Sequence, residues 1–141
     1  MKILIAPYSQ KLRNGRENAK NYPFWPQLIE QLKLQGHTIT LAPTKCSMKE
    51  MEELTRYCDI YICVDTFLQH VGQYLGKRGI VIWTVSDPAL FGYPNNINLL
   101  KHGKFLRPNQ YDTWENTPYN KDAAIDIETV LRAVDRLEDE L

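Results

Sequence analysis

The run Asp65-Thr-Phe-Leu-Gln-His70 combines residue types and spacing suited to anion binding, and it directly follows an apolar stretch. This order predicts a buried strand that passes into a helix. The first amides of a helix have no intrahelical acceptor and attract phosphate oxygens. We therefore interpret the turn as an anion site in which the Thr66 hydroxyl caps the helix and His70 donates to a phosphate or sugar hydroxyl. Alternatively, Asp65 and Thr66 only cap the helix, and His70 is a core residue.

A basic loop is expected at residues 7–22, where the sequence has neither a helical nor a strand period. It carries one acidic residue, Glu17, against four basic ones: Lys11, Arg13, Arg16 and Lys20. Loops of this length in compact domains are usually functional or disordered. Cations at this position would neutralise a diphosphate. The alternative is a solvated surface loop.

A third polar segment, Ser86-Asp-Pro-Ala-Leu-Phe-Gly92, follows another apolar run. If it lies beside the other two, Ser86 and Asp87 join the binding site, and Phe91 or Tyr93 lines a pocket for a base or a sugar. An ordinary turn explains the segment equally well.

The cysteines and histidines do not form a metal-binding pattern. Cys46, Cys58 and Cys63 lack CxxC spacing, and we interpret them as reduced packing residues. Asp65 and His70 have no further ligand at a suitable spacing. We expect no metal and no other cofactor.

The elements that position these residues alternate between strand and helix. Apolar or β-prone runs predict strands at residues 3–6, 38–42, 60–64 and 80–84. Helical patterns occupy residues 23–36, 47–57 and 65–76, and an amphipathic helix opens at Asp126. This alternation predicts an α/β fold, a single Rossmann-like three-layer sandwich with a mostly parallel sheet.

The expected winding of the sheet reverses between its first strand, 3–6, and strand 60–64. Ligands of such folds bind where the winding reverses. The basic loop and the turn at Asp65 meet there, so both point to one crevice. Prolines, glycines and asparagines make residues 85–119 mostly irregular, with one short strand expected at Lys104–Arg107.

Composition narrows the class of protein further. The 141 residues contain 17 basic and 17 acidic side chains. Without net positive charge, general nucleic-acid binding is unexpected. The longest apolar runs span five residues and do not resemble a signal peptide or membrane span. We expect one domain, residues 1–141, in the cytoplasm.

Several motifs, in order along almost the whole chain, resemble the C-terminal half of glycosyltransferase family 9, the heptosyltransferases of the GT-B fold. The family pattern runs from a buried strand through Asp-Thr-Gly-x-x-His, Leu-Gly-x and a second apolar strand to Ser/Thr-Asp-Pro. It is matched by Ile60–Val64, Asp65-Thr-Phe-Leu-Gln-His70, Leu75-Gly-Lys77, Ile80–Thr84 and Ser86-Asp-Pro88. Lys20-Asn-Tyr-Pro23 is similar to the Lys-x-Trp-Pro opening of the family's first helix.

The resemblance implies a domain that holds the diphosphate of a nucleotide-sugar donor for transfer of the sugar to an acceptor. Lys20 would pair with the phosphates, and His70 would support the turn that presents its amides. The remaining substrate-binding residues expected from the turn and the two neighbouring loops are Asp65, Thr66, Phe67, Ser86, Asp87 and Arg13.

The sequence departs from the family in three ways. Phe67 replaces a glycine that would let a phosphate approach the backbone. The chain between Ala42 and Ser47 omits a helix and a strand that contribute to the family's nucleoside site. The family's acceptor half, with its catalytic carboxylate, has no counterpart in this sequence. We therefore expect a companion acceptor-domain chain or a second copy, so that the protein works as an oligomer.

The large aromatic residues after the last strong strand suit such a contact, although they could also pack the loop onto the domain: Tyr93, Phe105, Tyr111, Trp114 and Tyr119. Other functions remain open. One is a non-catalytic module that binds a nucleotide or nucleotide-sugar. A nucleoside-processing enzyme with Asp65 or Asp87 as nucleophile shares the topology, and a structural protein with a decayed site is a further alternative.

Overall fold

The computed structural model describes residues 1–9 and 11–141. Within them five parallel strands form one sheet in the order β2-β1-β3-β4-β5. The strands are β1 (Lys2–Ala6), β2 (Thr38–Leu41), β3 (Ile60–Val64), β4 (Gly79–Trp83) and β5 (Ile97–Leu100). The expected central first strand and the reversal between β1 and β3 are therefore confirmed.

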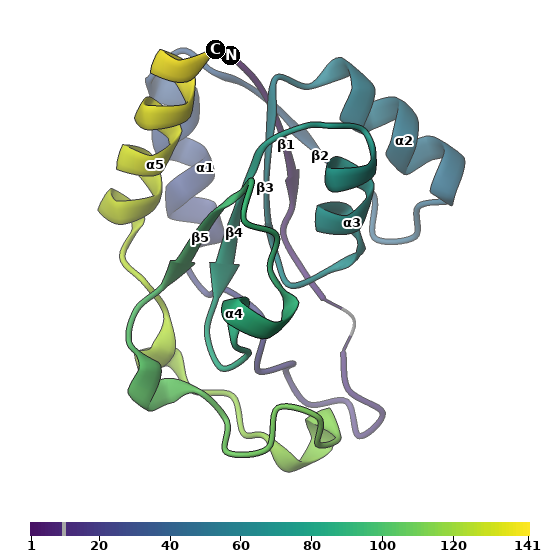
Figure 1. The fold of residues 1–141 in the computed structure, drawn as a ribbon, viewed down its shortest axis with the longest axis vertical. Coiled ribbons are helices and arrows are strands. Elements are labelled where there is room, and N and C mark those ends of the chain that lie inside the picture. The colour runs from purple at the N-terminus through teal and green to yellow at the C-terminus, as the bar shows by residue number, and fades with distance from the viewer. Residues whose placement is uncertain (10) are drawn as a thin grey trace.

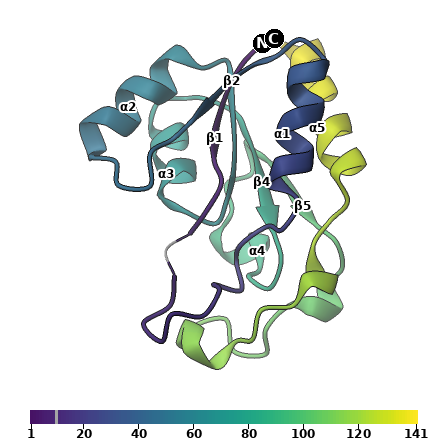
Figure 2. The ribbon, with the colours of Figure 1, turned by 180° about the vertical axis from the view of Figure 1, so that it is seen from behind.

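Helices cover both faces of the sheet and make three layers (Figures 1 and 2). On one face lie α1 (Trp25–Leu34) and α5 (Ile127–Glu140), and on the other lie α2 (Met48–Tyr57) and α3 (Phe67–Tyr74). The short α4 (Pro88–Phe91) follows β4, and single 3-10 turns span Gly103–Phe105, Trp114–Asn116 and Lys121–Ala123. The predicted Rossmann-like sandwich is confirmed. Among the described residues, none of the helices has the length and apolar composition needed to cross a membrane.

The apolar runs form strands because helices cover them on both sides. Every residue of β3 and β4 is buried. Along β1, Ile3 and Ile5 face the core under α1 and α5, while Leu4 between them faces the core under α2 and α3. Continuous apolar runs of this kind are typical of parallel sheets.

Local signals set the ends of the helices. The Ser47 hydroxyl accepts a hydrogen bond from the Glu50 amide at 3.1 Å, and the Asp126 carboxylate accepts one from the Thr129 amide at 2.8 Å. Gly36, with φ at 90°, adopts the left-handed conformation after α1 that glycine allows best. These expected boundaries are confirmed.

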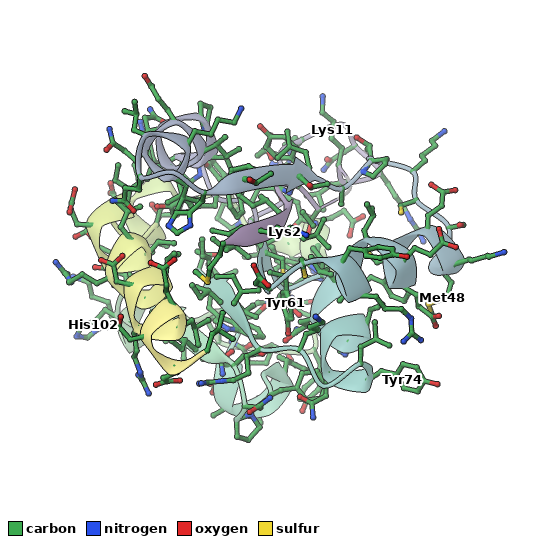
Figure 3. All side chains as sticks on the ribbon, turned by 90° about the horizontal axis from the view of Figure 1, so that it is seen from above. Lys2, Lys11, Met48, Tyr61, Tyr74 and His102 are labelled. Atoms are coloured by element: carbon green, nitrogen blue, oxygen red, sulfur yellow. The ribbon has the colours of Figure 1, made fainter. Side chains whose placement is uncertain are left out.

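The side chain of Tyr61 lies in the middle of the molecule (Figure 3) and connects β3 to β4 and to the segment before β5. Its hydroxyl donates to the Asn96 side-chain oxygen at 2.9 Å, and that oxygen also accepts from the Gly79 amide at 3.0 Å. A Cβ atom on Gly72 or on Gly79 would lie 2.2 Å from the Tyr61 ring. The two glycines therefore make room for a buried aromatic ring.

The prediction of a short strand at Lys104–Arg107 is wrong. Gly103–Phe105 forms a 3-10 turn, and the fifth strand lies earlier, at β5. Ile97 and Leu99 pair in register with Ile80 and Ile82 of β4. This run already occupies the free edge of β4, so the chain has left the sheet when it reaches Lys104.

Candidate functional site

A crevice of about 550 Å³ opens where the carboxyl ends of β1 and β3 meet, at the reversal of the winding. Its walls come from the loop after β1, the segment after β2, the turn after β3 and the distant pair Trp114 and Glu115. The loop after β1 contributes Lys11, Arg13 and Lys20, and the turn contributes Asp65, Thr66 and Phe67. The structure thus brings together two of the three segments singled out from the sequence.

Lys20 connects these two segments. Its ammonium group donates to the Asp65 backbone oxygen at 3.1 Å and lies 5.0 Å from the centre of the Trp114 ring. Burial lowers the pKa of Lys20 below its ordinary value of 10.5, against the opposing effect of the Asp65 charge. A partly desolvated cation that lines a crevice favours an anionic ligand.

The carboxylate of Asp65 is held within the turn. It accepts a hydrogen bond from the Gln69 side-chain nitrogen, Nε2, at 2.7 Å. Burial raises the pKa of Asp65, while the charges of Lys20 and His70 oppose that increase. Asp65 therefore serves mainly to orient the turn and to balance Lys20.

Thr66 occupies the position before α3, but its hydroxyl does not cap the helix as expected. The hydroxyl donates to the Val64 backbone oxygen at 3.3 Å, and within the described chain no side chain caps α3. That prediction was wrong because the Thr66 hydroxyl bonds back to the carbonyl at the end of β3 and not forward to an amide of α3. The uncapped start of α3 lines the crevice through Thr66, Phe67 and Leu68, so its first amides suit an anion.

His70 lies beside the site without lining the crevice that the described residues form. Its Nδ1 atom is 2.7 Å from the Tyr93 hydroxyl, and the two rings pack edge to face at 5.5 Å. The side chain is exposed, so the alternative of a core histidine is wrong. Its expected contact with a ligand stays a prediction.

The third segment divides into a part near the crevice and a part that builds the scaffold. Ser86 is buried and borders a narrow space beside Lys20 and Asp65. The Asp87 carboxylate instead accepts from the Ala89 amide at 2.9 Å and so caps α4. The cap uses one oxygen of the Asp87 carboxylate, and a role for Asp87 as a ligand or nucleophile stays a prediction.

Two residues near the site were not expected to act in binding. Arg107 is buried, with its guanidinium carbon 4.1 Å from the centre of the Trp114 ring. Trp114 stood out only as an aromatic residue suited to a protein contact. A single arginine in an irregular segment carries no sequence signal, because its placement depends on long-range folding of the segment after β5.

Among the described residues, no group of three or more His, Cys, Asp or Glu side chains is arranged to hold a metal ion. No family model matches this chain, and comparisons with curated proteins and with solved structures found no match. The function must therefore be argued from the crevice itself, in which cations and helix amides surround a space large enough for a small molecule.

Proposed function

We propose that this protein binds a nucleotide-sugar through its diphosphate and serves as the donor module of a glycosyltransferase similar to family 9. One observation carries the proposal: Lys20 is hydrogen bonded to the turn at Asp65, in the crevice where the sheet reverses its winding. Phosphorylated ligands of α/β folds occupy this position.

The residues of the crevice suit the departure of a diphosphate. Lys11, Arg13 and Lys20 supply positive charge, and the start of α3 supplies backbone amides. As an acceptor hydroxyl attacks the anomeric carbon, the bond from that carbon to the diphosphate oxygen breaks and negative charge develops on the diphosphate. Fixed cations and amides stabilise that charge.

The hydroxyl proton must pass to a base. Within the described part of the chain, Asp65 and Glu115 are the carboxylates that line the crevice. Asp65 is engaged with Gln69 and faces Lys20, which disfavours it as the base. Because the resemblance places the catalytic carboxylate on the family's acceptor half, we assign the base and the acceptor site to a companion chain or to a second copy of this protein.

A second candidate function is capture of a nucleotide or nucleotide-sugar without chemistry. The observation that favours it is Phe67, which lines the crevice where the family it resembles has a glycine. Such a module would bind the donor and leave it intact.

A thermal-shift screen of nucleoside diphosphates and nucleotide-sugars tests the proposal, with the matched nucleosides as controls. A ligand at 100 times its dissociation constant stabilises the folded state by about 2.7 kcal/mol. We expect shifts with the diphosphates and none with the nucleosides. The absence of a shift with every diphosphate would contradict both candidate functions. Release of the nucleoside diphosphate in the presence of a companion chain would separate transfer from capture.

A further inference from the structure

Arg107 is a buried cation whose hydrogen-bonding capacity is only partly used. Its side chain is 5% exposed. The Nη2 atom donates to the backbone oxygens of Asp112 and Thr113. Within residues 1–9 and 11–141, its Nε and Nη1 atoms have no hydrogen-bond partner. A buried charged group that lacks partners is costly, so such a group is normally completed by an acceptor.

The carboxylate whose charge acts on Arg107 belongs to Asp112, and one of its oxygens is engaged by other donors. Asp112 interacts with Arg107 through its charge. Its carboxylate, however, accepts hydrogen bonds from the Thr113 amide at 2.8 Å and from the Asn116 side chain at 3.0 Å. Asp65, which balances Lys20, is engaged by Gln69. Asp65 and Asp112 thus offset the charges of Lys20 and Arg107, but neither carboxylate is a hydrogen-bond partner of the Arg107 Nε and Nη1 atoms in the described chain.

The Trp114 ring lies close to both cations, Lys20 and Arg107. The Arg107 guanidinium carbon lies 4.1 Å and the Lys20 nitrogen 5.0 Å from the centre of its ring, so their separation is at most the sum of these distances. The positive charge of Arg107 helps to lower the pKa of Lys20, although burial contributes more. Trp114 also lines the crevice, and its ring therefore lies both against the crevice and against Arg107.

We propose that Lys20 and Arg107 together bind two linked phosphoryl groups, and that the Trp114 ring shifts away from the guanidinium to admit the second group. One bound phosphoryl group would neutralise Lys20, and the next would reach the unpartnered nitrogens of Arg107. The inference rests on the proposed function for the position of the diphosphate, but it requires neither the nucleoside nor the sugar.

Tryptophan fluorescence provides the readout. Trp25 and Trp83 are each 1% exposed, whereas Trp114 borders the crevice. Titration with inorganic pyrophosphate should change the emission, and Trp114→Phe should abolish the change. Pyrophosphate should bind at least about tenfold more tightly than inorganic phosphate, because a second charge-assisted contact forms. Equal affinities for the two anions would overturn the inference.

Variants of Arg107 test its contribution. Arg107→Gln should weaken pyrophosphate binding about tenfold or more and leave phosphate binding nearly unchanged. Arg56→Gln removes the same charge from the exposed surface of α2 and should change neither affinity. Equal losses in the two variants would indicate diffuse attraction and overturn the inference. If Arg107→Gln fails to fold, Arg107→Lys keeps the charge but loses the planar donor set, and it should lower the preference for pyrophosphate. A preference equal to that of the wild type would count against a role for the guanidinium.

These measurements separate this inference from the proposed function. Pyrophosphate binding that depends on Arg107, without binding of any nucleotide-sugar, would support the two-cation site and contradict the donor module. Nucleotide-sugar binding that is unchanged in Arg107→Gln would support the donor module and contradict the two-cation site.

Discussion

The side-chain nitrogen of Lys20 lies 3.1 Å from the backbone oxygen of Asp65, although 45 residues separate them in the sequence. This hydrogen bond holds the basic loop after β1 against the turn after β3 at the carboxyl edge of the sheet. A ligand in the crevice therefore meets a cation whose position is already set, which reduces the ordering required on binding.

Removal of the Lys20 side chain should weaken binding more than removal of a distant lysine. We expect Lys20→Ala to lower the affinity for a nucleoside diphosphate about tenfold or more, because a charge-assisted contact is lost. Lys33 is exposed in the last turn of α1, and Lys33→Ala should leave the affinity unchanged. Isothermal titration calorimetry measures both, and equal effects would indicate diffuse charge attraction.

The affinity for the anion should also depend on alkaline pH. Burial lowers the pKa of Lys20 below 10.5, so the free protein loses this positive charge earlier than an exposed lysine would. Affinity should fall as pH rises, with a midpoint below 10.5. Lys20→Arg keeps its charge over this range, and its affinity should not show that fall.

The same pKa shift predicts the sign of a stability change. Between the folded and unfolded pKa values of Lys20, the unfolded chain binds more protons. The contribution of Lys20 to the free energy of unfolding therefore increases with pH across that interval. A smaller pH dependence of stability in Lys20→Ala, measured by urea denaturation, would agree with this assignment; an unchanged dependence would contradict it.

Most of the sheet could be predicted because its strands are local apolar runs. The unbroken apolar runs at Ile60–Val64 and from Ile80 predict strands, since parallel strands buried on both faces are continuously apolar. The edge strand β5 could not be predicted, because Ile97–Leu100 is four residues long and lies in a segment rich in asparagine. Its pairing with β4 is a long-range contact that local patterns do not contain.

The residues of the crevice also include some that could be predicted from the sequence and some that could not. Lys20 and the turn at Asp65 were predictable, since the loop that carries Lys20 follows β1 and the turn follows β3, and the order of these strands follows from topology. Arg107 was not, because it reaches the site through the irregular chain after β5, where its amide bonds to the Val85 oxygen at 2.9 Å. The Thr66 prediction failed for a local reason: a hydroxyl before a helix can bond forward to an amide or back to a carbonyl.

Phe67 should limit the approach of a phosphate to the start of α3. Its side chain is 44% exposed and lines the crevice. We expect Phe67→Gly to raise the affinity for a nucleotide-sugar at a cost in stability of at most about 1 kcal/mol from helix propensity. Phe67→Ala is the control that removes the ring but keeps Cβ. Weaker binding in both variants would instead indicate that the ring contacts the ligand, as in stacking on a base.

The packing around Tyr61 predicts an exception to the usual benefit of alanine in a helix. Gly72→Ala would place its Cβ 2.2 Å from the Tyr61 ring. We expect a loss of about 1–3 kcal/mol from overpacking in place of the gain from helix propensity. Gly103→Ala, with open space around its Cβ, should be close to neutral. Chemical denaturation compares the two, and a neutral Gly72→Ala would show that the ring can move aside.

The last prediction concerns assembly at the crevice side of the molecule. Tyr111 is 77% exposed beside Phe91 of α4, and its chain segment leads to Trp114 in the crevice wall. Tyr74, at the end of α3, is 79% exposed and extends away from the body of the molecule (Figure 3). If a companion chain or a second copy completes the site, it covers Tyr111 and not Tyr74. Tyr111→Ser should then weaken assembly, measured by light scattering at micromolar concentration, and Tyr74→Ser should not. A wild-type protein that remains monomeric and binds no companion would leave transfer without its acceptor site, and capture of the donor would then be the better account of the crevice.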